Sequence, residues 1–179
     1  MVNAGSYLIS TIIGLYIIIV LLRFLLQLVK ADFYNPLSQF IIKATSPVLI
    51  PMRRFIPGLF GLDIASLTLA YTLQCIENFL LFALQGIPLN PLFILWHSIG
   101  SLLSLFLYIY FFAILIQIII SWISPGNYNP AIALIHRITE PVMQPARKIL
   151  PPFSGFDLSP LLVFVVLNIL IMFIPVLFG

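Results

Sequence analysis

Residues 34–63 read YNPLSQFIIKATSPVLIPMRRFIPGLFGLD, and residues 128–157 read YNPAIALIHRITEPVMQPARKILPPFSGFD. A shift of 94 residues aligns the two stretches without a gap, and 12 of the 30 positions are identical. Prolines, glycines and aspartates recur at matching places, which chance does not produce at this density. The sequence therefore predicts an internal duplication.

Each copy lies between two long apolar runs. A helix needs about 20 apolar residues to cross a bilayer core. Four stretches are long and apolar enough: 7–29, 64–84, 92–123 and 158–178. We predict an all-α integral membrane protein with four transmembrane helices, built as two tandem direct repeats of a helix, an interfacial amphipathic segment and a helix. Residues 1–179 form a single membrane domain, with repeat 1 at 7–86 and repeat 2 at 91–178. Because both copies have the same orientation, a pseudo-two-fold axis along the membrane normal should relate them.

The composition excludes an ordinary soluble domain. The chain is 62% hydrophobic and only 7% charged, whereas soluble domains average about 25% charged residues. Its few basic residues lie beside apolar segments and form no solvated basic face, so we expect no nucleic acid to bind. One cysteine, Cys75, excludes an internal disulfide. The sequence therefore indicates a chain largely covered by lipid.

The positions of the basic residues predict the orientation. Of eight lysines and arginines, four lie between the first two spans and three between the last two. The short connection 85–91 and both termini have none. The positive-inside rule then places segments 30–63 and 124–157 in the cytoplasm and both termini outside, in the periplasm.

The connecting segments have amphipathic helical patterns. Asn35 can cap a helix with Pro36 in its first turn, and apolar residues then share one face. In the first copy the apolar face comprises Leu37, Phe40, Ile41 and Ala44, and the polar face comprises Ser38, Gln39, Lys43, Thr45 and Ser46. In the second copy the apolar face comprises Ala131, Leu134, Ile135 and Ile138, and the polar face comprises His136, Arg137, Thr139 and Glu140. We expect Pro47 and Pro141 to interrupt or restart these helices. Such segments should lie in the interface or fold back against the spans.

Four basic residues near the ends of these segments are candidate interfacial contacts: Arg53, Arg54, Arg147 and Lys148. At headgroup level each would gain about 1 kcal/mol against anionic lipid. The predicted partner is therefore the bilayer, through anionic headgroups at the cytoplasmic face. A docking surface for a partner protein is the alternative.

Two ionisable residues lie inside predicted spans, where charges are costly. Arg23 is in the first span and Glu77 is in the second. A structural ion pair between them is the simplest prediction, and a polar lining for an ion or proton path is the alternative. Arg23 alone could instead extend to the cytoplasmic interface.

The duplication extends these candidates to the second repeat. Arg23 corresponds to Gln117, and Gln74 corresponds to Asn168. Facing inward, the four side chains could form an interhelical hydrogen-bond layer. Glu77 corresponds to Ile171, so its charge is not duplicated.

Two small or polar patterns predict close helix packing. His97, Ser101, Ser104 and Tyr108 form one stripe on the third span, and Ser10 with Gly14 is a small-xxx-small pair on the first. No set of residues has the spacing of a catalytic group or of a metal site. We therefore predict no catalytic residues, no metal and no cofactor.

The doubled N-P…P…P-x-R…P…G-x-D pattern between paired spans resembles the YggT family of bacterial membrane proteins. The resemblance covers nearly the whole chain. It implies a multi-pass, non-enzymatic protein of the bacterial inner membrane, linked to osmotic-stress tolerance or to ion (potassium) homeostasis. The alternative it implies is a membrane scaffold or assembly factor for a partner complex, related to the cell envelope and division or to cofactor assembly. A homo-oligomer or a membrane partner protein is then expected.

Overall fold

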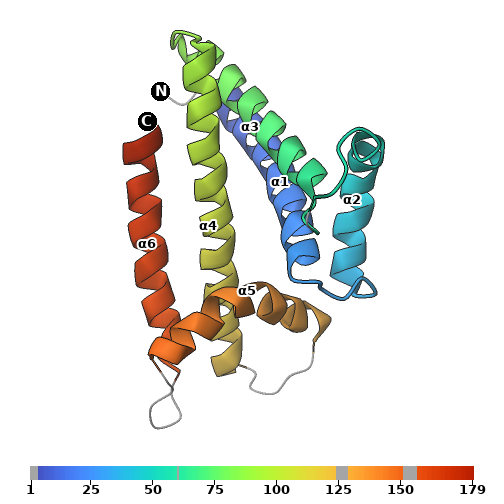
Figure 1. Cartoon of the computed structure of the whole chain (residues 1–179). Coiled ribbons are helices and arrows are strands. Elements are labelled where there is room, and N and C mark those ends of the chain that lie inside the picture. The colour runs from blue at the N-terminus through green and yellow to red at the C-terminus, as the bar shows by residue number, and fades with distance from the viewer. Residues whose placement is uncertain (1–3, 60, 124–128, 151–156) are drawn as a thin grey trace.

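The computed structural model describes residues 4–59, 61–123, 129–150 and 157–179 (Figure 1). In these ranges the chain forms six helices, in the order α1 (Ala4–Leu28), α2 (Pro36–Met52), α3 (Ile64–Gln85), α4 (Pro91–Ile123), α5 (Pro130–Ile149) and α6 (Ser159–Phe178). The repeat matches Pro151 and Gly155, and Tyr128 that opens the second quoted stretch, lie outside the described residues.

The four predicted spans are confirmed as α1, α3, α4 and α6, the helices long and apolar enough to cross a membrane. Their bounds differ from the predicted ones by three residues at most. Asp63 and Asn90 precede α3 and α4 and accept hydrogen bonds from backbone N–H groups of the first turns, as N-cap residues do. Large apolar side chains remain exposed along α6, including Leu161, Met172 and Val176, which is the surface expected of a lipid-facing helix.

Both connecting segments are helical and begin alike. The side chain of Asn35 accepts from Leu37 N at 3.0 Å, and that of Asn129 accepts from Ala131 N at 2.9 Å. Pro36 and Pro130 occupy the first helical positions, where a missing N–H costs nothing.

The prediction that prolines interrupt these segments is wrong. Helix α2 continues through Pro47 and Pro51, and α5 continues through Pro141 and Pro145. A proline inside a helix removes one backbone hydrogen bond and crowds the preceding turn. In α2, the hydroxyl of Ser46 and the guanidinium of Arg23 both donate to the Ile42 carbonyl in the turn before Pro47, which attaches this part of the helix to α1.

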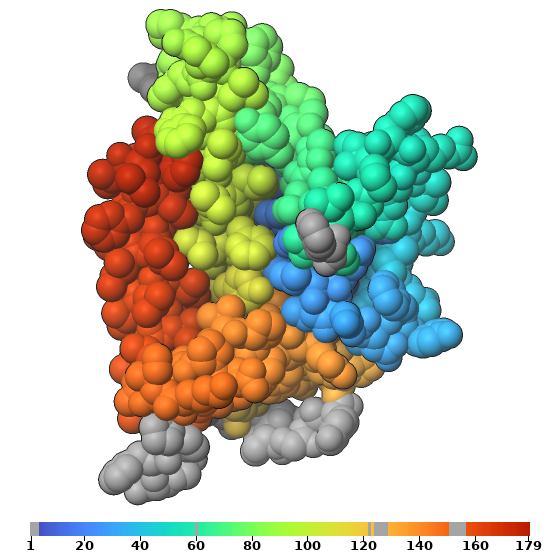
Figure 2. All heavy atoms as spheres, in the orientation of Figure 1, coloured from blue at the N-terminus to red at the C-terminus, as the bar shows by residue number. Residues whose placement is uncertain are grey.

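The two repeats form two helical units. In the first, α1 packs on α3 and α2; in the second, α4 packs on α6 and α5. The units meet along α3 and α4, and again between α2 and α5, where Asn35 Nδ2 donates to the Pro130 carbonyl at 2.7 Å. Figure 1 shows both chain termini at one end of the molecule, here called the terminal end, and α5 lying across the opposite end, here called the α2/α5 end. Figure 2 shows α5 as a continuous orange band below α6 and across the lower part of α4.

The buried face of α2 differs from the predicted one. Ser38, Ile41, Thr45 and Leu49 are buried, whereas Phe40 on the predicted apolar face is exposed. The hydroxyl of Thr45 faces inward because Arg23 of α1 provides its partner. A polar contact with the neighbouring span, absent from any single-helix pattern, thus decides which side of α2 is buried.

Candidate functional site

Arg23 attaches α2 to the first span. The side chain is 8% exposed. Its Nη1 donates to the Ile42 carbonyl at 2.9 Å, to Thr45 Oγ1 at 2.6 Å and to Ser46 Oγ at 3.1 Å. These acceptors satisfy a guanidinium that would otherwise be expensive to bury.

The second repeat makes the equivalent contact with a neutral group. Gln117 and Thr139 are the repeat equivalents of Arg23 and Thr45, and Thr139 Oγ1 lies at hydrogen-bond distance, 2.5 Å, from Gln117 Oε1. Thr139 is fully buried. In both units, therefore, a polar side chain of the first span holds the connecting helix through the same threonine position.

A second duplicated contact joins each connecting helix to the following span. Arg53 forms an ion pair with Asp63 at 2.5 Å, and Arg147 forms one with Asp157 at 3.2 Å. Arg147 also pairs with Glu140 at 3.1 Å. Both arginines thus form ion pairs within the chain, and their predicted contact with anionic lipid stays a prediction.

The two aspartates differ in environment. Asp63 is only 3% exposed and also accepts from Ser66. Burial alone would raise the pKa of Asp63, but hydrogen bonds from Arg53 and Ser66 outweigh it, so the pKa lies below its usual value. The pKa of Asp157 is also lowered. Burial would raise this pKa, but hydrogen bonds from Ser159 and Arg147 outweigh the effect of burial. Asp157 is 37% exposed, so its ion pairs are screened by solvent.

Arg54 and Lys148 remain available to an interfacial partner. Both side chains are exposed, and neither has an ion-pair partner among the described residues. The contact of Arg54 and Lys148 with lipid headgroups or with a partner protein stays a prediction.

The predicted ion pair between Arg23 and Glu77 is not formed. Arg23 bonds to α2, whereas Glu77 Oε2 accepts from Gln74 Nε2 of its own helix at 3.0 Å. Glu77 lies 13 residues into α3, about 20 Å from the start of the helix at 1.5 Å per residue. All three acceptors of Arg23 lie in α2. The carboxyl group of Glu77 therefore has no cationic partner in the described part of the chain.

Glu77 instead borders a cavity of about 420 Å³ between α1, α3 and α4, whose mainly apolar surface carries several polar side chains. Oxygen-bearing side chains of all three helices surround it: Ser10, Thr11, Gln74, Glu77, Ser101, Ser104 and Tyr108. Ser101, Ser104 and Tyr108 of the predicted stripe thus line this cavity, together with the Ser10–Gly14 pair. His97, the fourth member of the stripe, stacks on Phe82 and Phe93 instead. This cavity is our candidate functional site.

Local contacts leave ligand atoms available in the cavity. Ser10 and Thr11 donate to the Tyr7 carbonyl, and Ser101 donates to the His97 carbonyl. Each hydroxyl thereby uses its proton on its own helix, and its oxygen can still act as an acceptor. Ser101 Oγ already accepts from Asn78 Nδ2 at 3.5 Å and keeps one lone pair. Gly14 lies beside the carboxylate: a Cβ added there would be 3.9 Å from Glu77 Oε1.

The predicted four-membered polar layer is not formed. Arg23 and Gln117 bond to the connecting helices, and Gln74 bonds to Glu77. Asn168 is exposed, and its amide donates to the Phe164 carbonyl one turn earlier in α6 at 2.8 Å. Arg23 and Gln117, at equivalent positions, thus both bond to a connecting helix. Gln74 and Asn168, also at equivalent positions, have different partners.

Sequence reasoning missed Thr45 and Thr139 as partners of the spans. Both had been assigned to the polar, outward faces of their helices. The available signal was their identity in the two copies, alongside Arg53 with Asp63 and Arg147 with Asp157 at the same separation of ten residues. An identical threonine on an otherwise divergent helix marks a specific contact.

Comparisons with known proteins agree with this architecture. A family model described as CCB3/YggT matches the chain twice, at residues 2–84 and 96–178, and the same 94-residue shift relates the two matches. An uncharacterized protein of Pseudomonas aeruginosa is 48% identical over 175 residues, which cover 96% of this chain and 88% of the relative. An uncharacterized Vibrio alginolyticus protein is 42% identical over 166 residues, covering 91% and 89%. The uncharacterized protein YggT of Escherichia coli strain K12 is 37% identical over 172 residues, covering 94% and 87%. No solved structure matches.

Proposed function

The chain belongs to the CCB3/YggT family, and from this premise we propose that it is a non-enzymatic protein of the bacterial inner membrane that binds K⁺ at Glu77. The binding serves ion homeostasis under osmotic stress. The observation that carries the proposal is a buried carboxyl group, inside a span, that borders a cavity with several oxygen-bearing side chains and has no cationic partner among the described residues.

The cost of burying Glu77 favours a bound cation. An ionised group inside a membrane is costly unless it is paired. Gln74 supplies one hydrogen bond but no charge. An alkali cation would neutralise the carboxylate, and such ions take oxygen ligands of the kind that the surrounding hydroxyls and amide provide.

The surroundings of the cavity favour a binding site over a continuous pore. Ile18, Leu105 and Tyr108 of its lining also border a second cavity whose lining is almost wholly apolar. An apolar stretch opposes the passage of a hydrated ion. We therefore expect saturable, carrier-like exchange of cations.

We also propose that the α2/α5 end lies in the cytoplasm and both termini in the periplasm. The four basic residues from Lys30 to Arg54 and the three from Arg137 to Lys148 all lie in or beside α2 and α5, as the positive-inside rule requires. Glu77 would then lie in the half of α3 nearer the periplasm.

Glu77→Gln tests the proposed function. The amide keeps the shape of the side chain and removes its charge, so we expect saturable K⁺ or radioactive rubidium uptake into proteoliposomes to fall by about tenfold or more. Glu140→Gln, which removes an exposed carboxylate of α5, is the matched control and should leave uptake unchanged. Equal uptake by Glu77→Gln and the unaltered protein would refute the proposal.

A second candidate function, a membrane scaffold, is favoured by Asn168. This amide is exposed on the otherwise apolar outer face of α6, and polar side chains in such places join transmembrane helices. We propose that it meets a second copy of the chain. Asn168→Leu should weaken the dimer by about 0.6 kcal/mol for each interhelical hydrogen bond lost. Size-exclusion chromatography in mild detergent should then show a larger fraction of monomer. Val165→Leu on the same exposed face is the control, and an unchanged dimer in Asn168→Leu would rule this contact out.

A further inference from the structure

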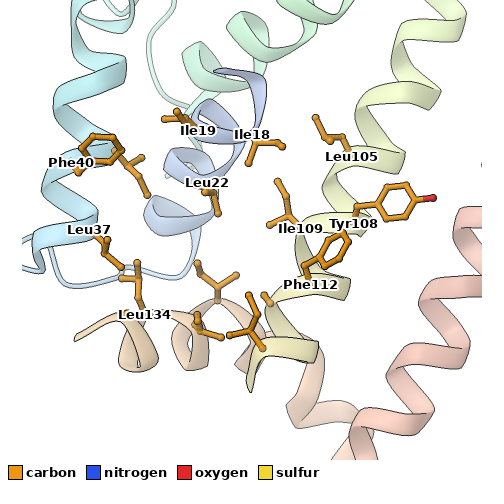
Figure 3. A pocket seen from close by; sticks show the side chains of 16 residues that line it. Ile18, Ile19, Leu22, Leu37, Phe40, Leu105, Tyr108, Ile109, Phe112 and Leu134 are labelled. Atoms are coloured by element: carbon orange, nitrogen blue, oxygen red, sulfur yellow. The ribbon is translucent and has the colours of Figure 1, made fainter. Parts of the chain in front are cut away.

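A large apolar cavity lies between the two repeats, beside α2 and α5. Its volume is about 790 Å³, within the range of about 300–1,000 Å³ typical of ligand sites. Helices α1, α2, α4 and α5 all contribute side chains that point into it (Figure 3). The lining is almost wholly apolar: Tyr108 is the one lining residue with a polar side-chain group, and Figure 3 shows its hydroxyl pointing away from the other lining side chains.

The lining is built from repeat-equivalent residues. Of its 16 residues, 12 form six pairs separated by 94 positions: Ile18 with Phe112, Ile19 with Ala113, Leu22 with Ile116, Leu37 with Ala131, Phe40 with Leu134, and Ile41 with Ile135. The cavity is therefore lined largely by equivalent positions of the two repeats. The apolar faces of both connecting segments, predicted to face lipid or the spans, in fact line this cavity.

A second, polar cavity adjoins the first at the α2/α5 end. Its volume is about 520 Å³, and it shares Leu134 with the apolar cavity. Asn35 and Asn129, the equivalent N-caps of α2 and α5, lie in its wall. An apolar cavity that adjoins a more polar cavity at the starts of two helices suits an amphiphile.

Two charged groups line the polar cavity without an ion-pair partner in the described residues. Arg137 and Asp32 both border it, and neither forms a salt bridge there. One oxygen of Asp32 accepts from Tyr34 N at 2.9 Å. A guanidinium binds phosphate well, and a free carboxylate oxygen binds an ammonium group, so the pair suits a headgroup that carries both charges.

We propose that the two cavities bind one molecule of phosphatidylethanolamine, with its phosphate at Arg137, its amine at Asp32 and an acyl chain in the apolar cavity. Acyl chains would fill a space that water does not occupy, because an apolar cavity offers water no hydrogen bonds. The lipid would also join the two repeats, whose direct polar contact at this end is the bond from Asn35 to Pro130. The apolar cavity adjoins the cavity beside Glu77, but it does not include Glu77 and its occupant is a lipid, so the inference goes beyond the proposed function.

Native mass spectrometry of protein purified in mild detergent, with phosphatidylethanolamine supplied, tests the apolar cavity. We expect one bound lipid per chain. Ala113→Phe and Ala131→Phe, which fill the cavity, should lower the bound fraction by about tenfold. Ala83→Phe, at an exposed position of α3, is the matched control. Unchanged binding in both filled variants would overturn the proposal.

The headgroup assignment has its own test. Arg137→Gln and Asp32→Asn should each lower retention of phosphatidylethanolamine by about fivefold, whereas Lys43→Gln, the repeat equivalent of Arg137 that lies outside the cavity, should not. Equal retention of phosphatidylglycerol by the unaltered protein would overturn the assignment of the amine to Asp32.

The unaltered protein provides a test that does not depend on variants folding. Phosphatidylethanolamine with a photoreactive group in its acyl chain should label peptides of α4 and α5 that line the cavity. Labelling concentrated on the exposed face of α6, with no enrichment at the cavity, would contradict the site.

Discussion

Asp63→Ala should lower the free energy of unfolding by about 2–3 kcal/mol, measured by unfolding in mild detergent. The change removes the N-cap of α3, which is worth about 1 kcal/mol. It also removes a charged partner of Arg53 and Ser66, and hydrogen bonds to charged groups contribute about 1.5–3 kcal/mol. We take the lower part of that range because Arg53 is 39% exposed and solvent screens its charge.

The repeat supplies the control for Asp63. Asp157→Ala removes the equivalent carboxylate, but this side chain and Arg147 are both about one-third exposed. Exposed pairs contribute about 0–1 kcal/mol, so the loss should be smaller than for Asp63→Ala. Equal losses in the two variants would show that burial of Asp63 is not the source of its contribution.

The effect of Asp63 should depend on pH. Because the pKa of Asp63 is lower in the folded protein, its stabilising contribution is complete above the unfolded value of about 3.9 and is lost as the pH falls through the folded value. The difference in unfolding free energy between the unaltered protein and Asp63→Ala should therefore shrink below about pH 4. A difference that stays constant down to pH 3 would contradict this assignment.

Gly14→Leu should abolish cation binding although Glu77 is still present. A leucine side chain would project from α1 toward the carboxylate, into a cavity of about 420 Å³. We expect the affinity for K⁺ to fall by about tenfold or more, because the ligand oxygens would no longer surround the ion. Equilibrium binding of radioactive rubidium to the purified protein measures this change.

Gly14→Ala is the matched control for the leucine variant. A Cβ at this position would be 3.9 Å from Glu77 Oε1, an ordinary van der Waals distance. The alanine variant should therefore bind K⁺ nearly as well as the unaltered protein. If leucine and alanine left binding equally intact, the cavity beside Gly14 would not be the site.

The spans, the caps and the duplication could be predicted from the sequence because each depends on local information. Length and hydropathy define α1, α3, α4 and α6, and Asn35 and Asn129 with their following prolines define the starts of α2 and α5. The identical spacing of the two copies reveals the repeat without knowledge of any contact.

The partners of the polar residues could not be predicted, because they depend on how helices rotate against one another. Arg23 and Glu77 are the obvious opposite charges, yet the hydroxyls and carbonyl of α2 satisfy Arg23 first. Thr45 therefore points inward, against the pattern of its own helix. The cavity around Glu77 combines residues of three helices, and only their packing brings these residues together.

The most direct test of the account is equilibrium binding of K⁺ to the purified protein in detergent, compared with Glu77→Gln. The account predicts saturable binding of one ion per chain, lost in the amide variant and retained in Glu140→Gln. Binding that is equal in the unaltered protein and Glu77→Gln, or no binding by either, would contradict the assignment of Glu77 as the cation site.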